Sequence, residues 1–104
     1  MTFDLNTLYQ IILDRIKGKQ TDSYTATLSK QGIARIAQKV GEESIEVVIE
    51  ATKSPQNRER IISESADLIF HHLVLLANCQ ITPEEVFKEL EKRHLLKSST
   101  PKDN

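Results

Sequence analysis

Two pairs of acidic residues share one spacing in this sequence. Glu43 and Glu46 lie three positions apart, and so do Glu64 and Asp67. Residues three apart in an α-helix fall on the same face, so each pair would present two carboxylates side by side. Four carboxylates without sulfur form a set of hard oxygen donors that suits Mg2+ or Mn2+. A single pair of this kind is usually a solvated helix face, so the interpretation depends on the helices that carry the acids.

The segments around both pairs are unusually apolar. On a helical wheel of residues 32–52, a polar column lies between two apolar strips and contains Lys39, Glu43, Glu46 and Glu50. Residues 57–79 are apolar around most of the wheel, and the main polar stripe contains Arg60, Glu64, Asp67, His71 and Asn78. Acids placed in this way are expected to face an interior or a cleft. Carboxylates there need a compensating positive charge.

These patterns predict an all-α chain with three long helices and a shorter C-terminal one. The helices are expected over residues 4–17, 32–52, 57–79 and 82–94, and the polar segment 19–31 is expected to be a loop. The short turn at residues 53–56 would fold the two acid-bearing helices into an antiparallel hairpin, with their acidic pairs facing each other.

Capping residues indicate where the third and fourth helices begin. Asn57 can cap the third helix, and Thr82 followed by Pro83 and Glu85 matches the start of the fourth. Residues 1–96 are predicted to form a single domain, and residues 97–104 a flexible tail.

Length, charge and cysteine content narrow the class of protein. The 104 residues are enough for one domain, and 14 basic against 15 acidic residues give a net charge of −1. This balance provides no general attraction for nucleic acid or an anionic membrane. No segment reaches the roughly 20 apolar residues of a membrane span, and the start of the chain does not resemble a signal peptide, so a cytoplasmic location is expected.

Cys79 is the only cysteine, which excludes an intrachain disulfide and a zinc-cysteine site. Its apolar surroundings favour a buried thiol.

Residues 39–48 (KVGEESIEVV) closely resemble the phosphoribosyl-ATP pyrophosphatase family, which catalyses the second step of histidine biosynthesis. The resemblance continues in residues 23–25 (SYT), 58–60 (RER), 64–71 (ESADLIFH), 73–76 (LVLL) and 89–94 (ELEKRH), and so extends over nearly all of residues 5–94. The wider group of all-α, MazG-like nucleotide pyrophosphatases shares mainly the two acidic pairs.

The resemblance implies a helical subunit that dimerises into a larger bundle. It also implies the Mg2+-dependent hydrolysis of phosphoribosyl-ATP to phosphoribosyl-AMP and pyrophosphate. Mn2+ is an alternative metal on the grounds of the oxygen donors. Glu43, Glu46, Glu64 and Asp67 are then the expected catalytic residues and metal ligands. A homodimer is expected on independent grounds, because so small a subunit cannot easily enclose this many apolar side chains.

Several other polar residues are candidates for substrate binding. Lys39 and Arg60 each lie one turn before an acid, so each either contacts phosphate or pairs with that acid. Lys30, Ser23 and Thr25 are further candidates for contacts with the substrate.

Two aromatic residues leave alternatives open. His71 shares the stripe of Asp67, where it is either an interior histidine or an outer contact to a ligand carboxylate. Tyr24 either stacks on a base or packs on the core, and packing is favoured.

Three rival interpretations remain. A general nucleoside triphosphate pyrophosphatase would keep the site and change the substrate. A di-iron bundle would need two E-x-x-H motifs, and only Glu91 with His94 fits. A non-catalytic helical dimerisation module would explain the apolar surface but not the four acids.

Overall fold

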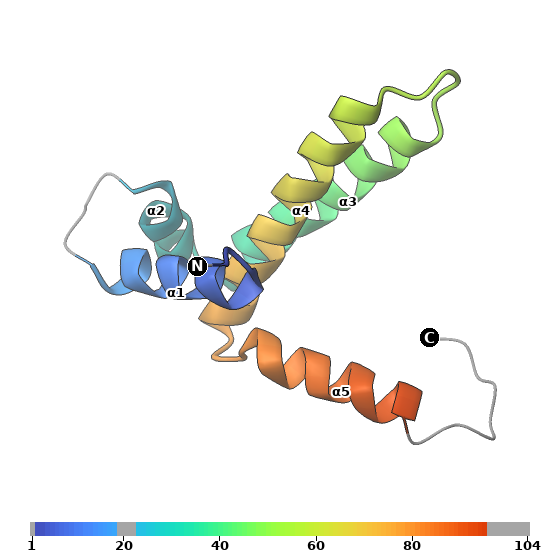
Figure 1. Ribbon diagram of the computed structural model, residues 1–104. Coiled ribbons are helices and arrows are strands. Elements are labelled where there is room, and N and C mark those ends of the chain that lie inside the picture. The colour runs from blue at the N-terminus through green and yellow to red at the C-terminus, as the bar shows by residue number, and fades with distance from the viewer. Residues whose placement is uncertain (1, 19–22, 96–104) are drawn as a thin grey trace.

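The computed structural model describes residues 2–18 and 23–95, which form five α-helices and no strand (Figure 1). The helices are α1 (Leu5–Lys17), α2 (Tyr24–Gln31), α3 (Ile33–Ala51), α4 (Arg58–Asn78) and α5 (Pro83–Leu95). The predicted all-α class is confirmed. The predicted tail at residues 97–104 lies outside the described residues.

The prediction of four helices was wrong, because part of the expected loop is helical. Helix α2 begins after Ser23, whose hydroxyl accepts a hydrogen bond from the backbone N–H of Ala26 at 3.3 Å. The helix buries Ala26 and Leu28. Packing of this kind stabilises a short helix whose composition alone does not predict it. Gly32, with a φ of 100°, separates α2 from α3 in a conformation that glycine adopts without strain.

Helices α3 and α4 form the expected antiparallel hairpin, which projects away from the other helices (Figure 1). The predicted caps are confirmed. The side chain of Asn57 accepts a hydrogen bond from the backbone N–H of Arg60 at 3.2 Å at the start of α4. Thr82 and Glu85 form a capping box, in which the Thr82 N–H donates to the Glu85 carboxylate at 3.0 Å and the Glu85 N–H donates to the Thr82 hydroxyl at 3.2 Å.

The hydrophobic core lies where α1 and α2 meet the hairpin. Its buried members are Tyr9, Ile12, Leu28, Ile36, Leu73, Val74 and Ala77. Farther along the hairpin, the residues of α3 and α4 between positions 37 and 70 that are buried are Glu50 and Glu64. The fold therefore anchors one end of the hairpin in an apolar core and buries acids toward the other.

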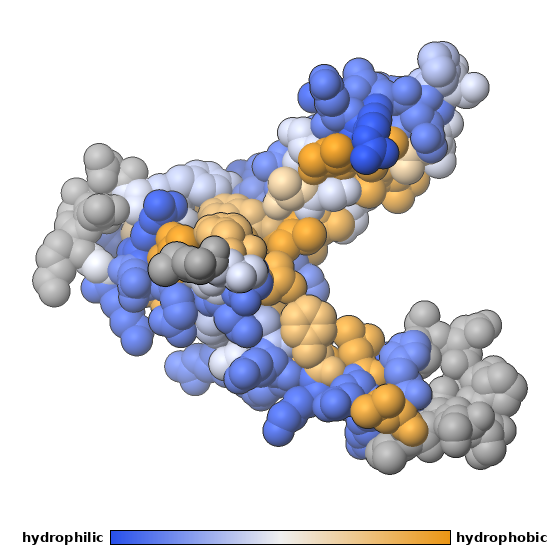
Figure 2. Space-filling view, viewed as in Figure 1, coloured by the Kyte–Doolittle hydropathy of each residue, from blue (hydrophilic) through white to orange (hydrophobic). Residues whose placement is uncertain are grey.

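Large apolar side chains remain exposed on the two arms of the molecule. On α3 and α4 they include Ile45, Val48, Ile49, Ile62 and Ile69, and on α5 they include Phe87, Leu90 and Leu95. Figure 2 shows apolar surface on the sides of the two arms that face the open space between them. None of the described helices is both long enough and apolar enough to cross a membrane.

The expectation of a buried thiol was wrong, because Cys79 is exposed just after α4.

Candidate active site

Three of the four predicted acids meet between α3 and α4. One carboxylate oxygen each from Glu43, Glu64 and Asp67 lie within 4.8 Å of one another. Glu64 is buried, Glu43 is partly buried and Asp67 is exposed, so the group opens from the interior of the hairpin toward solvent. The antiparallel hairpin brings these acids together because it sets α3 and α4 side by side. Three hard oxygen donors in this space fit a divalent cation such as Mg2+.

Glu46 lies close to this group without belonging to it. It is exposed on α3, one turn after Glu43. The negative charge of Glu46 nevertheless acts on Glu64, since it is one of the causes of the raised pKa of Glu64. The structure thus places all four predicted acids in one region and brings three of them within reach of a single ion.

The electrostatic environment of Glu64 is unfavourable for a bare carboxylate. Burial raises the pKa of Glu64 above its ordinary value; Arg60 opposes this rise, while the negative charges of Glu46, Glu43 and Asp67 add to it. Like charges and low solvent access both disfavour the ionised form. A cation between these acids would instead favour the ionised form of Glu64.

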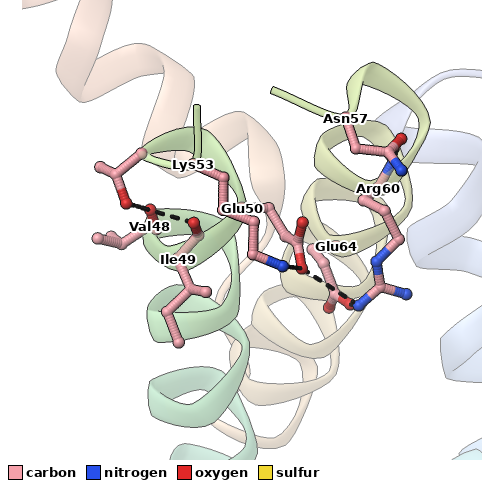
Figure 3. A network of polar contacts seen from close by, with 8 residues as sticks. Val48, Ile49, Glu50, Lys53, Asn57, Arg60 and Glu64 are labelled. Carbon is pink, nitrogen blue, oxygen red and sulfur yellow. Dashed lines mark hydrogen bonds and ion pairs between the residues drawn. The ribbon is translucent and has the colours of Figure 1, made fainter. Parts of the chain in front are cut away.

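Basic side chains flank the acids at two points. Arg60 Nη2 lies 3.1 Å from Glu64 Oε2 and 3.4 Å from Glu50 Oε2, as Figure 3 shows. Lys39 Nζ lies 3.9 Å from Glu43 and 3.7 Å from Glu42. Lys39 and Arg60 therefore each pair with an acidic neighbour, as one of the two alternatives predicted.

Glu50 is a member of the site region to which sequence analysis gave no role. Its side chain is only 4% exposed, and Oε2 accepts hydrogen bonds from Lys53 at 3.1 Å and from Arg60 at 3.4 Å. The hydrogen bond from Lys53 lowers the pKa of Glu50, against the effect of burial. The signal in the sequence was its position at the end of the polar column, but pairing with Arg60 becomes visible only once the hairpin is formed.

His71 is an interior residue, as one of the two alternatives predicted. It is 6% exposed, and its Nδ1 lies 2.9 Å from the backbone carbonyl oxygen of Asp67. A carbonyl oxygen only accepts, so Nδ1 carries a proton, and in the neutral imidazole Nε2 accepts from the Tyr24 hydroxyl at 2.8 Å. The contact of His71 is thus to the backbone of Asp67. Tyr24 packs against His71 and Phe70 but remains 52% exposed.

The remaining predicted residues lie on α2 or at its start. The Ser23 hydroxyl caps the helix, Thr25 is 1% exposed, and Lys30 is exposed in the last turn. The acids Glu43, Glu64 and Asp67 themselves lie on α3 and α4.

Comparison with known proteins gives consistent results. A family model described as phosphoribosyl-ATP pyrophosphohydrolase matches residues 5–94. The chain is 50% identical over 86 residues to a phosphoribosyl-ATP pyrophosphatase of Saccharolobus islandicus, which covers 83% of this chain and 89% of that protein. It is 51% identical over 86 residues to the same enzyme of Saccharolobus solfataricus, with the same coverage. It is 51% identical over 89 residues to that of Sulfurisphaera tokodaii, covering 86% of this chain and 93% of that protein.

Proposed function

Since this chain belongs to the phosphoribosyl-ATP pyrophosphohydrolase family, we propose that the carboxylates of Glu43, Glu64 and Asp67, together with Glu46, form its catalytic centre. The chain is a hydrolase of histidine biosynthesis that converts phosphoribosyl-ATP to phosphoribosyl-AMP and pyrophosphate. The observation that carries the proposal is the convergence of three carboxylate oxygens within 4.8 Å on two adjacent helices.

We propose Mg2+ as the cofactor, with Mn2+ as an alternative. The donor set supports this proposal, because the three converging groups are carboxylates and hard cations prefer oxygen ligands. The raised pKa of Glu64 supports it too, since a buried acid among other acids is stabilised by a bound cation. When bound, the metal ion supplies positive charge to the phosphoryl oxygens and the departing pyrophosphate.

The side chains around the cluster perform the other tasks of hydrolysis. Glu43, Glu64 and Asp67 would hold the cation beside the hairpin, and one carboxylate of the cluster would accept the proton of the attacking water. Lys39 and Arg60 offset the charge of the triphosphate from the two ends of the cluster. Their pairing with Glu43 and Glu64 places both cations beside the cluster, where a metal ion on these acids would leave them free to contact the phosphates. For Ser23 and Thr25 the support is the resemblance of residues 23–25, and for Lys30 it is the positive charge of its side chain alone.

We also propose that the enzyme is a homodimer. Exposed apolar side chains on α3 and α4, including Ile45 at 60% and Val48 at 58% exposure, support a second copy as the element that covers them. A cytoplasmic location is proposed from the biosynthetic role.

The direct test measures pyrophosphate released from phosphoribosyl-ATP by the purified chain, with Mg2+ and with a chelator. We expect turnover only with the divalent ion, and we expect E64Q and D67N to abolish it while keeping helicity. E89Q is the matched control, since Glu89 is an exposed acid on α5 that pairs with Arg93. Full activity of E64Q and D67N would refute the site assignment.

The same assay separates the rival functions. Equal turnover of ordinary nucleoside triphosphates would favour a general pyrophosphatase. A chain with no turnover and no response to Mg2+ would favour a dimerisation module.

A further inference from the structure

Glu50 is a buried acid that packing does not explain. Its side chain is 4% exposed at the far end of the hairpin, whereas the neighbouring Ile49 is 43% exposed. Burying a carboxylate is unfavourable unless other groups compensate it, and burying an isoleucine is favourable. This part of α3 therefore places the acid inside and the aliphatic side chain outside, which points to a role for the acid.

The contacts of Glu50 are concentrated on one oxygen. Lys53 at 3.1 Å and Arg60 at 3.4 Å both donate to Oε2, while Oε1 is buried without a hydrogen-bond partner. Lys53 lies on the same side of the hairpin turn as Glu50 and already supplies a counter-charge at the shorter distance. The pairing with Arg60 crosses from α3 to α4, and this second pairing places a cation at the acid cluster.

Arg60 pairs with two acids: Glu50, which is not a predicted metal ligand, and Glu64, which is. The same terminal nitrogen, Nη2, lies 3.4 Å from buried Glu50 and 3.1 Å from Glu64, and Figure 3 shows the guanidinium bridging them. The described residues engage Arg60 through this nitrogen and its backbone only. Its Nε and Nη1 groups therefore remain available, on a side chain that is 52% exposed.

We propose that Glu50 is a positioning residue that holds Arg60 at the edge of the acid cluster for binding of the substrate's phosphate. The inference rests on the proposed function, in which Glu64 binds a divalent cation. Once the charge of Glu64 is shared with that cation, its hold on Arg60 weakens and Glu50 is the acid that keeps the guanidinium in place. A guanidinium held from one side presents its other N–H groups as a planar donor for phosphate oxygens.

The test is a double-mutant cycle with E50Q, R60Q and the double variant. Pyrophosphate binding in the presence of Mg2+ is measured by calorimetry, and kcat and KM for phosphoribosyl-ATP are measured separately. We expect R60Q to weaken pyrophosphate binding about tenfold or more, the typical effect of losing a charged hydrogen bond. E50Q should weaken it about threefold to tenfold and raise KM more than it lowers kcat. The double variant should match R60Q, because Glu50 acts through Arg60.

Three further variants make the result decisive. K53Q removes the other cation on Glu50 but leaves the pairing with Arg60, so its pyrophosphate affinity should stay within about twofold of the starting protein. E89Q breaks an exposed Glu–Arg pair of similar length, 3.1 Å, on α5 and should change nothing. E64Q reports on the metal site itself and should lose the Mg2+-dependent rise in melting temperature, which E50Q should retain.

The outcomes are distinct. If E50Q only lowers the melting temperature and leaves KM and pyrophosphate affinity unchanged, Glu50 is a structural residue and the inference is wrong. Additive effects of E50Q and R60Q, or an equal loss in K53Q, would also overturn it. If instead E64Q keeps its Mg2+ response and full activity, the proposed metal site fails.

Discussion

Replacing Glu64 with glutamine should make the metal-free protein more stable at neutral pH, although it removes an ion-paired acid. The folded-state pKa of Glu64 is raised, chiefly by burial and further by Glu46, Glu43 and Asp67. A raised pKa means that the folded chain binds the proton more tightly than the unfolded chain does. Ionised Glu64 therefore costs stability above its raised pKa, and that cost disappears as the pH falls below its ordinary value of 4.5. The gain in E64Q should reach its full value above the raised pKa of Glu64 and should vanish as the pH falls below 4.5.

Magnesium should stabilise the starting protein more than it stabilises E64Q. At a free Mg2+ concentration ten times the dissociation constant, binding stabilises the folded state by about 1.4 kcal/mol. For a domain of about 100 residues, this raises the melting temperature by roughly 6–11 °C. Removing one of the three converging carboxylates should weaken Mg2+ binding about 100-fold. The same Mg2+ concentration would then stabilise folded E64Q by less than about 0.1 kcal/mol.

Thermal unfolding with a chelator and with Mg2+, at fixed protein concentration and at several pH values, measures both effects. E89Q should follow the starting protein throughout. The reasoning is refuted if E64Q melts below the starting protein in chelator at pH 8, or if both gain equally from Mg2+.

Three other substitutions test the assembly and the local structure. Ile45→Glu puts a charge on a side chain that is 60% exposed in the subunit, and it should yield monomers in sedimentation at micromolar concentration; a dimer that persists would move the interface elsewhere. Asn57→Ala removes the cap of α4 and should cost about 1 kcal/mol, or roughly 4–8 °C in melting temperature, with unchanged pyrophosphate release per folded chain. Tyr24→Phe removes the hydroxyl that donates to buried His71 Nε2 and should cost roughly 0.5–1.5 kcal/mol in chemical denaturation, whereas no loss would indicate that water replaces it.

The hairpin and its acids follow from the sequence because their signals are local. Asn57 caps α4 through the next few residues, and the three-residue spacing of Glu64 and Asp67 fixes their common face on a helix. The antiparallel turn then leaves few ways to place them relative to Glu43. The convergence of these three acids was therefore within reach of sequence reasoning.

Other features depend on tertiary contacts that no local pattern encodes. Helix α2 has few apolar residues, and its stability comes from the burial of side chains such as Leu28 against distant helices. The pairing of Glu50 with Arg60 spans ten positions and depends on how far α3 and α4 are shifted along each other. Cys79 follows an apolar run yet is exposed, because the chain leaves the helix there and turns toward α5.

In the far half of the hairpin, acids are buried and aliphatic side chains are exposed, the opposite of the usual arrangement in a globular protein. This feature links the proposed metal site to the proposed homodimer. Acids such as Glu50 and Glu64 are buried between the helices, while Ile45, Val48 and Ile62 are exposed on them. Buried like charges need a cation, and exposed aliphatic side chains need a covering surface. A metal ion alone would leave the isoleucines in water, and a second copy alone would leave Glu64 in an unfavourable field. The same two helices therefore give the proposed cation and the proposed partner subunit separate physical grounds.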